Sequence, residues 1–349
     1  MIFKIGDKLI GDSHPALLVA ELSANHNGSL ETAIKTIQAA KFAGADAIKL
    51  QTYTPDTITI DVDNDYFKIN YGTIWDGNNL YELYKETYTP WEWHEKLFEV
   101  ARDEGLLCFS SPFDNSSIDF LETLDCPAYK IASPEVVDTN LITYAASKGK
   151  PMIISTGIAD KNDICEAINS CKKAGNDQIA LLKCTAQYPA KIEDANLSMI
   201  PEYKKEFNVI PGLSDHTLGD IVPVSSTILG AKIIEKHFIL DKSIGGADAA
   251  FSLDTVGFSE MVKKVRSAES SLGKIDYSLS KKTRKDREFS SRSLFIVEDI
   301  ERGEVLTTKH VRSIRPGYGL HPKFLNSVMG KVMVESVKKG QPLKWEMLD

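Results

Sequence analysis

The segment Ala45-Asp46-Ala47-Ile48-Lys49-Leu50-Gln51 alternates in the character of its side chains. Successive side chains of a β-strand point to opposite faces, so Ala47, Lys49 and Gln51 share one face and the two apolar residues between them share the other. Small or polar residues on the inner face of a strand and apolar residues on the outer face suit a closed barrel that is covered by helices. The segment therefore predicts a barrel strand whose lysine points inward.

Similar short apolar runs recur along the chain and alternate with amphipathic stretches, a pattern typical of βαβ units. The expected strands are 16–22, 45–51, 106–111, 128–133, 151–156, 178–185, 209–215 and 232–238. The expected helices are 30–43, 90–104, 116–124, 140–147, 161–174, 196–207, 219–229 and 256–272. Eight strands that are each followed by a helix predict an α/β fold, a (β/α)8 TIM barrel, although counting alone leaves a doubly wound sheet open.

The length of 349 residues suits one large domain and a small one. We expect a catalytic barrel over 1–280, a linker over 281–292 (KKTRKDREFSSR) and a small, mostly β module over 293–349. A module of this size buries little core, so it is expected to dock onto a barrel. The connection 52–89 is too long for a plain loop and rich in aromatic residues, which favours an ordered flap. A decorative insertion on the barrel rim is the alternative.

The net charge of −8 argues against a nucleic-acid binder, and no apolar run is long enough to span a membrane. Since the first residues also lack the apolar region of a signal peptide, a cytoplasmic location is expected. The five cysteines include no C-x-x-C pair and are expected to be reduced. The chain has no Walker A motif, and no G-x-G-x-x-G follows a strand, which argues against binding of a nucleoside triphosphate or a dinucleotide.

Polar residues stand where nearly every expected strand ends, and in a barrel these ends converge on the face that holds the active site. Lys49 and Lys130, together with strand-end hydroxyls, could hold a phosphate and a carboxylate through charge-assisted hydrogen bonds. These hydroxyls belong to Ser111, Ser133, Ser155 and Ser214. Taken singly, each hydroxyl is more often part of a turn or a helix cap. Lys130 and Ser133 are an odd number of residues apart, so both cannot point inward from one regular strand. Jointly, the lysines and hydroxyls predict a site for a small polyanion.

His216 and His237 follow adjacent strands and could bind a transition metal with positions left for water and substrate. Structural histidines are the alternative. The carboxylates of Asp215, Glu235 and Asp248 stand nearby as possible partners of the histidines. Glu21 is the candidate for general acid or base chemistry, or for an ion pair with one of the lysines.

At these residues the chain resembles the sialic acid synthase family, most closely its pseudaminic branch. The resemblance rests on seven motifs together: 20–28 (AELSANHNG), 45–52 (ADAIKLQT), 110–113 (SSPF), 129–133 (YKIAS), 155–157 (STG), 212–217 (GLSDHT) and 235–238 (EKHF). The segment 315–320 (RPGYGL) is similar to the antifreeze-like (SAF) domain that ends these enzymes.

The resemblance implies a transferase that condenses phosphoenolpyruvate, an acetamido-hexose and water with the help of Mn²⁺ or Mg²⁺. It implies that Lys49, Lys130 and the four serines bind phosphoenolpyruvate, that His216 and His237 bind the metal, and that Glu21 lies beside the reacting carbons. Contacts to the sugar are expected from Gln51, Tyr188, Asp248 and Arg315. In the family the tail of one subunit reaches the partner's barrel, so a domain-swapped homodimer is expected with Arg315 acting across it.

Two departures favour the pseudaminic branch and the substrate 2,4-diacetamido-2,4,6-trideoxy-altrose. The motif 184–189 (CTAQYP) lacks the asparagine of N-acetylneuraminate enzymes, and the segments 245–252 and 317–323 look like the pseudaminic branch. An N-acetylneuraminate or legionaminate synthase remains an alternative. A heptulosonate-type synthase would lack the terminal module, and a non-catalytic sugar-binding or ice-binding protein would keep its function without Lys49 and His237.

Overall fold

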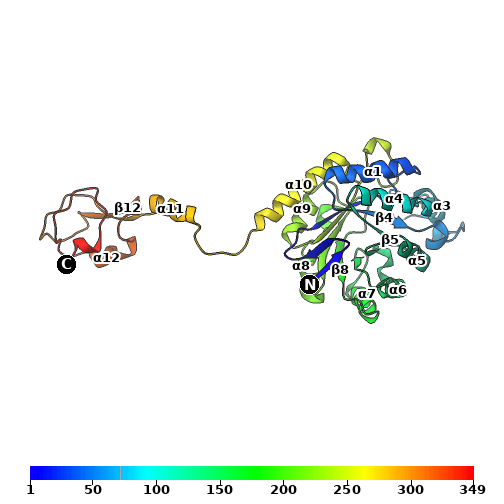
Figure 1. Ribbon diagram of the computed structural model, residues 1–349, viewed down its shortest axis with the longest axis horizontal. Helices are drawn as coiled ribbons and strands as arrows, with labels where there is room; N and C mark the ends of the chain where they lie inside the picture. Colours follow the sequence, from blue (N-terminus) through cyan, green and yellow to red (C-terminus); the bar gives the residue numbers. More distant parts are fainter. Residues whose placement is uncertain (71) are drawn as a thin grey trace. The chain divides into compact units, whose positions relative to one another are not determined.

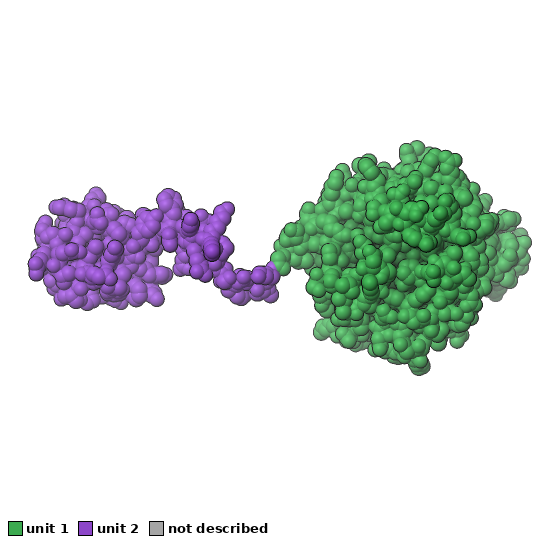
Figure 2. Space-filling model, in the orientation of Figure 1, with its two compact units in different colours: residues 1–273 green, residues 274–349 purple. Residues whose placement is uncertain are grey.

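The computed structural model describes residues 1–70 and 72–349 and divides them into two compact units, Met1–Gly273 and Lys274–Asp349 (Figures 1 and 2). In the described part, no helix is long and apolar enough to cross a membrane. The first unit extends from the amino end to seven residues before the boundary expected at 280. Each unit has a hydrophobic core of its own.

Eight parallel strands close into a barrel in the first unit. In barrel order they are β3 (Leu17–Glu21), β4 (Ala47–Thr52), β5 (Leu107–Pro112), β6 (Tyr129–Ile131), β7 (Met152–Ser155), β8 (Ile179–Cys184), β9 (Ile210–Asp215) and β10 (Ile233–His237). The barrel is closed because β10 also pairs with β3, where His237 is in register with Glu21. The (β/α)8 prediction is confirmed, and closure excludes the doubly wound sheet.

Helices surround the barrel strands (Figure 1). The helices that follow the strands are α1 (Leu30–Ala43), α4 (Trp91–Asp103), α5 (Asn115–Thr123), α6 (Thr139–Ser147), α7 (Lys161–Lys173), α8 (Met199–Phe207), α9 (Ile221–Ile228) and α10 (Thr255–Leu272). Helix α1 begins where the Ser29 side chain accepts a hydrogen bond from the backbone N–H of Thr32, and it ends at Gly44 in the left-handed conformation. It buries Ala33, Ile37 and Ala40 against the barrel, which explains why periodicity alone located it.

A β-hairpin that the sequence analysis did not predict precedes the barrel. Its strands β1 (Ile2–Ile5) and β2 (Lys8–Gly11) are antiparallel, and Ile5 and Ile10 are buried. A Cβ atom on Gly6 would lie 2.4 Å from Leu107, the first residue of β5. The hairpin therefore packs at the amino ends of the strands, away from the face that carries active sites in such barrels.

The connection after β4 is ordered into short helices, α2 (Pro55–Ile58), η1 (Asp65–Phe67) and α3 (Leu80–Thr87). We call residues 53–88 the flap. Tyr53 anchors it, because its ring lies 5.2 Å from that of Phe113 and its hydroxyl is 3.0 Å from Thr87 Oγ1. Tyr71, one of the aromatic residues on which the flap was predicted, lies outside the described residues.

The second unit begins with helix α11 (Lys281–Ser290), where the sequence analysis expected a linker. The Ser280 hydroxyl caps this helix by accepting from the backbone N–H of Thr283. The many charged residues suggested a linker. They form a helix instead, because Lys, Arg and Glu are good helix formers and a helix that is exposed at every residue needs no apolar face. Further along lie β11 (Ser293–Ile296), antiparallel to β12 (Val311–Ile314), and the short helices η5 (Pro322–Phe324), α12 (Leu325–Val328) and η6 (Trp345–Met347).

Candidate active site

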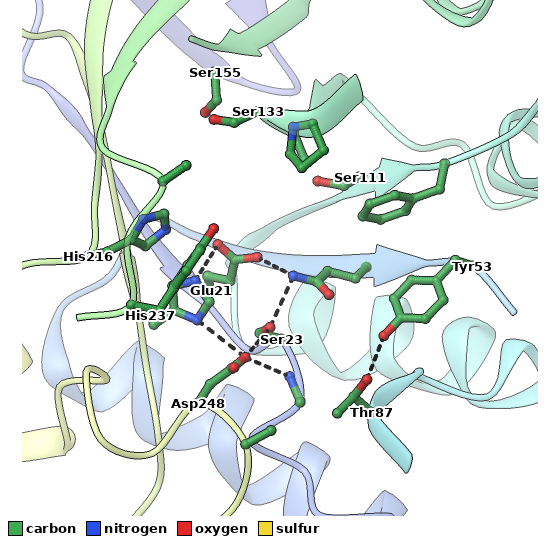
Figure 3. Close-up of a pocket in the computed structure, with 18 of the residues that line it drawn as sticks. Glu21, Ser23, Tyr53, Thr87, Ser111, Ser133, Ser155, His216, His237 and Asp248 are labelled. Carbon is green, nitrogen blue, oxygen red and sulfur yellow. Dashed lines mark hydrogen bonds and ion pairs between the residues drawn. The ribbon is translucent and has the colours of Figure 1, made fainter. Parts of the chain in front are cut away.

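A pocket of about 490 Å³ opens at the carboxyl ends of the barrel strands. The barrel residues expected to act in catalysis, substrate binding or metal binding all line it, and Figure 3 labels seven of them. These residues are Glu21, Lys49, Gln51, Ser111, Lys130, Ser133, Ser155, Tyr188, Ser214, His216, His237 and Asp248. Arg315, the remaining candidate, is an exposed residue of the second unit, just after β12.

Buried charges of both signs form the floor of the pocket. Lys49 Nζ lies 3.0 Å from Glu21 Oε2 and 3.0 Å from Glu235 Oε1, and Lys130 Nζ lies 3.8 Å from the same Glu235 oxygen. Ser214 donates a hydrogen bond of 2.8 Å to that oxygen. Strands β3, β4, β6 and β10 bring these groups together because alternate residues at their ends point inward.

This arrangement controls which groups are ionised. Burial opposes the charge on Glu21, but Lys49, His237 and Lys130 outweigh it and lower the pKa of the carboxyl. Burial likewise opposes the charge on Lys49, but Glu21 and Glu235 raise its pKa. Burial lowers the pKa of Lys130, which Glu235 only partly offsets. Glu21 is therefore a carboxylate at neutral pH, able to accept a proton rather than donate one.

The hydroxyl groups of the predicted anion site surround the lysines. Ser111 Oγ and Ser155 Oγ are buried and have no hydrogen-bond partner among the described residues. Ser133 Oγ accepts from the backbone N–H of Gly157 at 2.9 Å. Strand β6 ends at Ile131, so Ser133 lies beyond it. The alternation of side chains along the strand therefore does not apply to Ser133, and both Lys130 and Ser133 can face the pocket. Buried polar groups without partners are rare, so Ser111 and Ser155 point to a polar ligand.

The two histidines lie side by side in the pocket, with ring centroids 5.2 Å apart in an edge-to-face arrangement (Figure 3). His216 Nδ1 lies 2.9 Å from the Thr185 carbonyl oxygen, which can only accept, so in the neutral ring the lone pair is on Nε2. His237 lies between two carboxylates, with Nε2 3.4 Å from Glu21 and Nδ1 3.6 Å from Asp248. The described residues hold no cluster of three or more His, Cys, Asp or Glu side chains arranged around one metal position.

This donor set nevertheless fits a divalent metal ion. A neutral imidazole whose second nitrogen is fixed by a carbonyl is the usual form of a histidine ligand. His237 Nδ1 is buried and makes no hydrogen bond within the described part of the chain, although the Asp248 carboxylate lies 3.6 Å away. The two histidines would offer nitrogen donors and leave the remaining positions open for water and a substrate oxygen.

A chain of hydrogen bonds connects Asp248 to Glu21. Ser23 donates to Asp248 Oδ2 at 2.5 Å, and Gln51 Nε2 donates both to Ser23 Oγ at 3.0 Å and to Glu21 Oε1 at 2.8 Å. Asp248 also contacts His237, and together these partners lower its pKa against the effect of burial. The network fixes the orientation of Gln51 and Asp248, the two expected sugar contacts of the barrel.

Two carboxylates that the sequence suggested as partners of the histidines have other partners in the structure. Glu235, considered as a partner of the histidines, pairs with Lys49 and Lys130 instead. Asp215 pairs with Lys236 at 2.5 Å and does not line the pocket. It points away because Asp215 and Ser214 are neighbours on β9, and only one of two successive side chains can face inward.

Other pocket residues were missed entirely. Glu135 lies just beyond β6 in the 3-10 helix η2 (Pro134–Val137), and burial raises the pKa of its carboxyl to about 7. Ser23 was quoted only as part of a motif. The flap also forms an apolar side of the pocket, which no sequence motif predicted. Its residues are Ile58, Ile69, Trp75, Leu80, Leu83 and Tyr84. The many aromatic residues of the segment 52–89 were the feature of the sequence that could have indicated a role in the pocket.

Comparisons with known proteins identify the family of this chain. The sequence model of the NeuB family matches residues 36–277, more than half of the chain. The chain belongs to the NeuB family. The SAF domain model matches residues 291–349 in the second unit, as the sequence analysis predicted. In this NeuB-family protein the barrel and the SAF domain therefore correspond to the two compact units.

Individual relatives of this NeuB-family chain extend over nearly its whole length. Pseudaminic acid synthase from Campylobacter jejuni (serotype O:2) is 50% identical over 94% of this chain and 95% of its own. Pseudaminic acid synthase from Helicobacter pylori is 47% identical over 94% and 96%. Among solved structures, N-acetylneuraminic acid synthetase from Leptospira borgpetersenii has a TM-score of 0.73 at 28% identity, covering 82% of this chain and 95% of that one.

Proposed function

We propose that this NeuB-family protein is a pseudaminic acid synthase, which condenses phosphoenolpyruvate with 2,4-diacetamido-2,4,6-trideoxy-altrose and water to give pseudaminic acid and phosphate. The observation that carries the proposal is that one pocket at the mouth of the barrel holds two buried lysines and two buried serine hydroxyls that have no hydrogen-bond partner among the described residues. Two pseudaminic acid synthases are 47–50% identical to this chain over 94% of its length, which supports the pseudaminic branch of the family.

Phosphoenolpyruvate supplies both anionic groups that the pocket floor suits. Its phosphate and carboxylate would be held by Lys49, Lys130 and the hydroxyls of Ser111, Ser133, Ser155 and Ser214. Carbon 3 of phosphoenolpyruvate forms the new bond to the sugar aldehyde, a water oxygen adds at carbon 2, and the bond to the phosphate oxygen then breaks. Lysines fixed in a buried site stabilise the negative charge that develops without first having to reorganise.

Glu21 would accept the proton that the attacking water loses. Its carboxyl is ionised because of Lys49 and His237, and Gln51 holds one of its oxygens at 2.8 Å. We assign a divalent metal ion, Mn²⁺ or Mg²⁺, to His216 and His237, where it would polarise the sugar aldehyde as a Lewis acid. Tyr188, whose ring centroid is 4.3 Å from that of His216, would pack against the sugar beside them.

We further propose that the protein is a cytoplasmic homodimer in which the SAF domain of one subunit brings Arg315 to the pocket of the other. Among the described residues that line the pocket there are two lysines and no arginine, whereas Arg315 is exposed and close to β12. A planar guanidinium suits the carbonyl or carboxylate groups of a bound acetamido-sugar and phosphoenolpyruvate.

The test is to measure phosphate release with phosphoenolpyruvate, Mn²⁺ and one sugar at a time. The proposal expects turnover with 2,4-diacetamido-2,4,6-trideoxy-altrose and little with N-acetylmannosamine or with the diacetamido sugar of legionaminate synthesis. Release with N-acetylmannosamine alone would refute the choice of branch. Lys49→Ala and His237→Ala serve as variants that should lose phosphate release, which a non-catalytic binding protein would not predict.

A further inference from the structure

The side of the pocket formed by the flap is apolar. Four aliphatic residues of the flap line it, Ile58, Ile69, Leu80 and Leu83, and we call them the flap wall. In Figure 3, Tyr53 and Thr87 lie on the opposite side of the pocket from His216 in that view. The reaction of phosphoenolpyruvate takes place at the charged floor, so the part of the sugar away from its aldehyde must meet the flap.

Most polar groups on this side are already engaged. The Thr87 hydroxyl donates to the Leu83 carbonyl at 2.8 Å, so the Tyr53 hydroxyl, 3.0 Å away, donates to Thr87. The Thr73 hydroxyl donates to Asp76 at 2.9 Å. A sugar hydroxyl placed against the aliphatic flap wall would therefore lose hydration, and these three hydroxyls have no hydrogen left to donate to it, which is costly.

Trp75 is an exception within the flap, and Glu135 Oε2, outside the flap, is another pocket atom without a partner among the described residues. Trp75 lines the pocket, and its Nε1 is buried with no hydrogen-bond partner among the described residues. The Trp75 ring lies 5.3 Å from that of Tyr188, which in turn lies 4.3 Å from His216. An indole nitrogen can only donate, so the missing partner is an acceptor such as a carbonyl oxygen.

An apolar wall and an unpartnered N–H donor that line the same pocket match the chemistry of an acetamido group, which has a methyl group and a carbonyl oxygen. We infer that the flap wall and Trp75 form a subsite for the acetamido group on carbon 4 of the sugar, a specificity determinant that rests on the proposed function. The substituent on carbon 2 adjoins the aldehyde and stays near the histidines. The methyl of the carbon 4 group packs on Leu83 and its neighbours, while its oxygen accepts from Trp75 Nε1.

The experiment compares two sugars that differ only at carbon 4, the diacetamido trideoxy-altrose and its 4-hydroxy analogue. With the full-length protein, phosphoenolpyruvate and Mn²⁺, kcat/KM should favour the acetamido sugar by roughly 10- to 100-fold. Leu83→Asn, similar in size but polar, should reduce this preference about tenfold or more. Trp75→Phe keeps an aromatic ring without the donor and should reduce it by roughly 3- to 10-fold.

Ile74→Thr is the matched control, because Ile74 is an exposed neighbour of Trp75 that does not line the pocket. It should leave the preference unchanged. The subsite would be refuted if both test variants kept the wild-type preference, or if they lost activity equally on the two sugars, as general damage to the flap would produce. If the wild type turned over neither sugar, the proposed function would fail, and titration calorimetry of the two sugars against the unmodified protein would still measure the preference.

Discussion

Lys49 Nζ lies 3.0 Å from Glu235 Oε1, and both side chains are almost completely buried. Removing one partner of a buried ion pair leaves an uncompensated charge, which costs about 3–5 kcal/mol. We therefore expect Lys49→Met to lower the free energy of unfolding by about 3 kcal/mol in urea denaturation and to abolish phosphate release. Adding Glu235→Gln to it should recover part of this stability but no activity, because Glu21 would still lack its lysine partner.

Lys96→Met provides the control for the loss of a lysine. Lys96 is exposed and pairs with Glu99 at 2.7 Å on the surface of α4. Such pairs contribute about 0–1 kcal/mol, so stability and activity should stay close to wild type. Wild-type stability of Lys49→Met would contradict the assignment of Lys49 as the counter-ion of the buried carboxylates.

The proposed metal site predicts ligand-dependent stability as well as activity. Chelation with EDTA should abolish phosphate release, and Mn²⁺ should restore it. At a concentration 100 times its Kd, Mn²⁺ should raise the free energy of unfolding by about 2.7 kcal/mol. His216→Ala should lose most of this increase, whereas His310→Ala, in the second unit, should retain it. An equal response of both variants would argue against His216 as a ligand.

Glu135 predicts a specific pH dependence of stability. Burial raises the pKa of its carboxyl from 4.5 to about 7 in the folded protein. Between these values the folded protein binds more protons than the unfolded chain, so Glu135 reduces stability as pH rises. Relative to wild type, Glu135→Gln should therefore gain stability progressively from pH 4.5 to pH 7, by up to roughly 3 kcal/mol. Denaturation curves across this range measure it, and a constant difference would mean that Glu135 titrates normally.

The proposed action of Arg315 across a dimer can be tested by subunit mixing. Lys49→Ala and Arg315→Ala homodimers should each be inactive. In a mixed dimer one pocket carries both defects, while the other combines an intact floor with an intact tail. Statistical exchange between equal amounts should therefore restore roughly a quarter of wild-type activity, given two-fold symmetry. No recovery after confirmed exchange would place Arg315 in the pocket of its own subunit, or outside any pocket.

Much of the barrel and its site could be predicted from local sequence. Strand ends differ from the predictions by at most two residues, because each strand is a short apolar run between helices with clear periodicity and caps. The N-terminal hairpin was missed since strands of four residues with a polar turn give little signal. Helix α11 was missed because a fully exposed helix has no apolar face to reveal its period.

The sequence by itself determined that Lys49, Lys130, the serines and the two histidines would share one face, because the carboxyl ends of parallel barrel strands converge. Only the tertiary structure decided which charges pair. Glu235 neutralises the lysines while Asp215 turns outward to Lys236, a choice set by distances between strands rather than by spacing along the chain. The tertiary structure likewise decided that the flap forms one side of the pocket, since contacts between a long connection and a distant strand end leave no periodic trace in sequence.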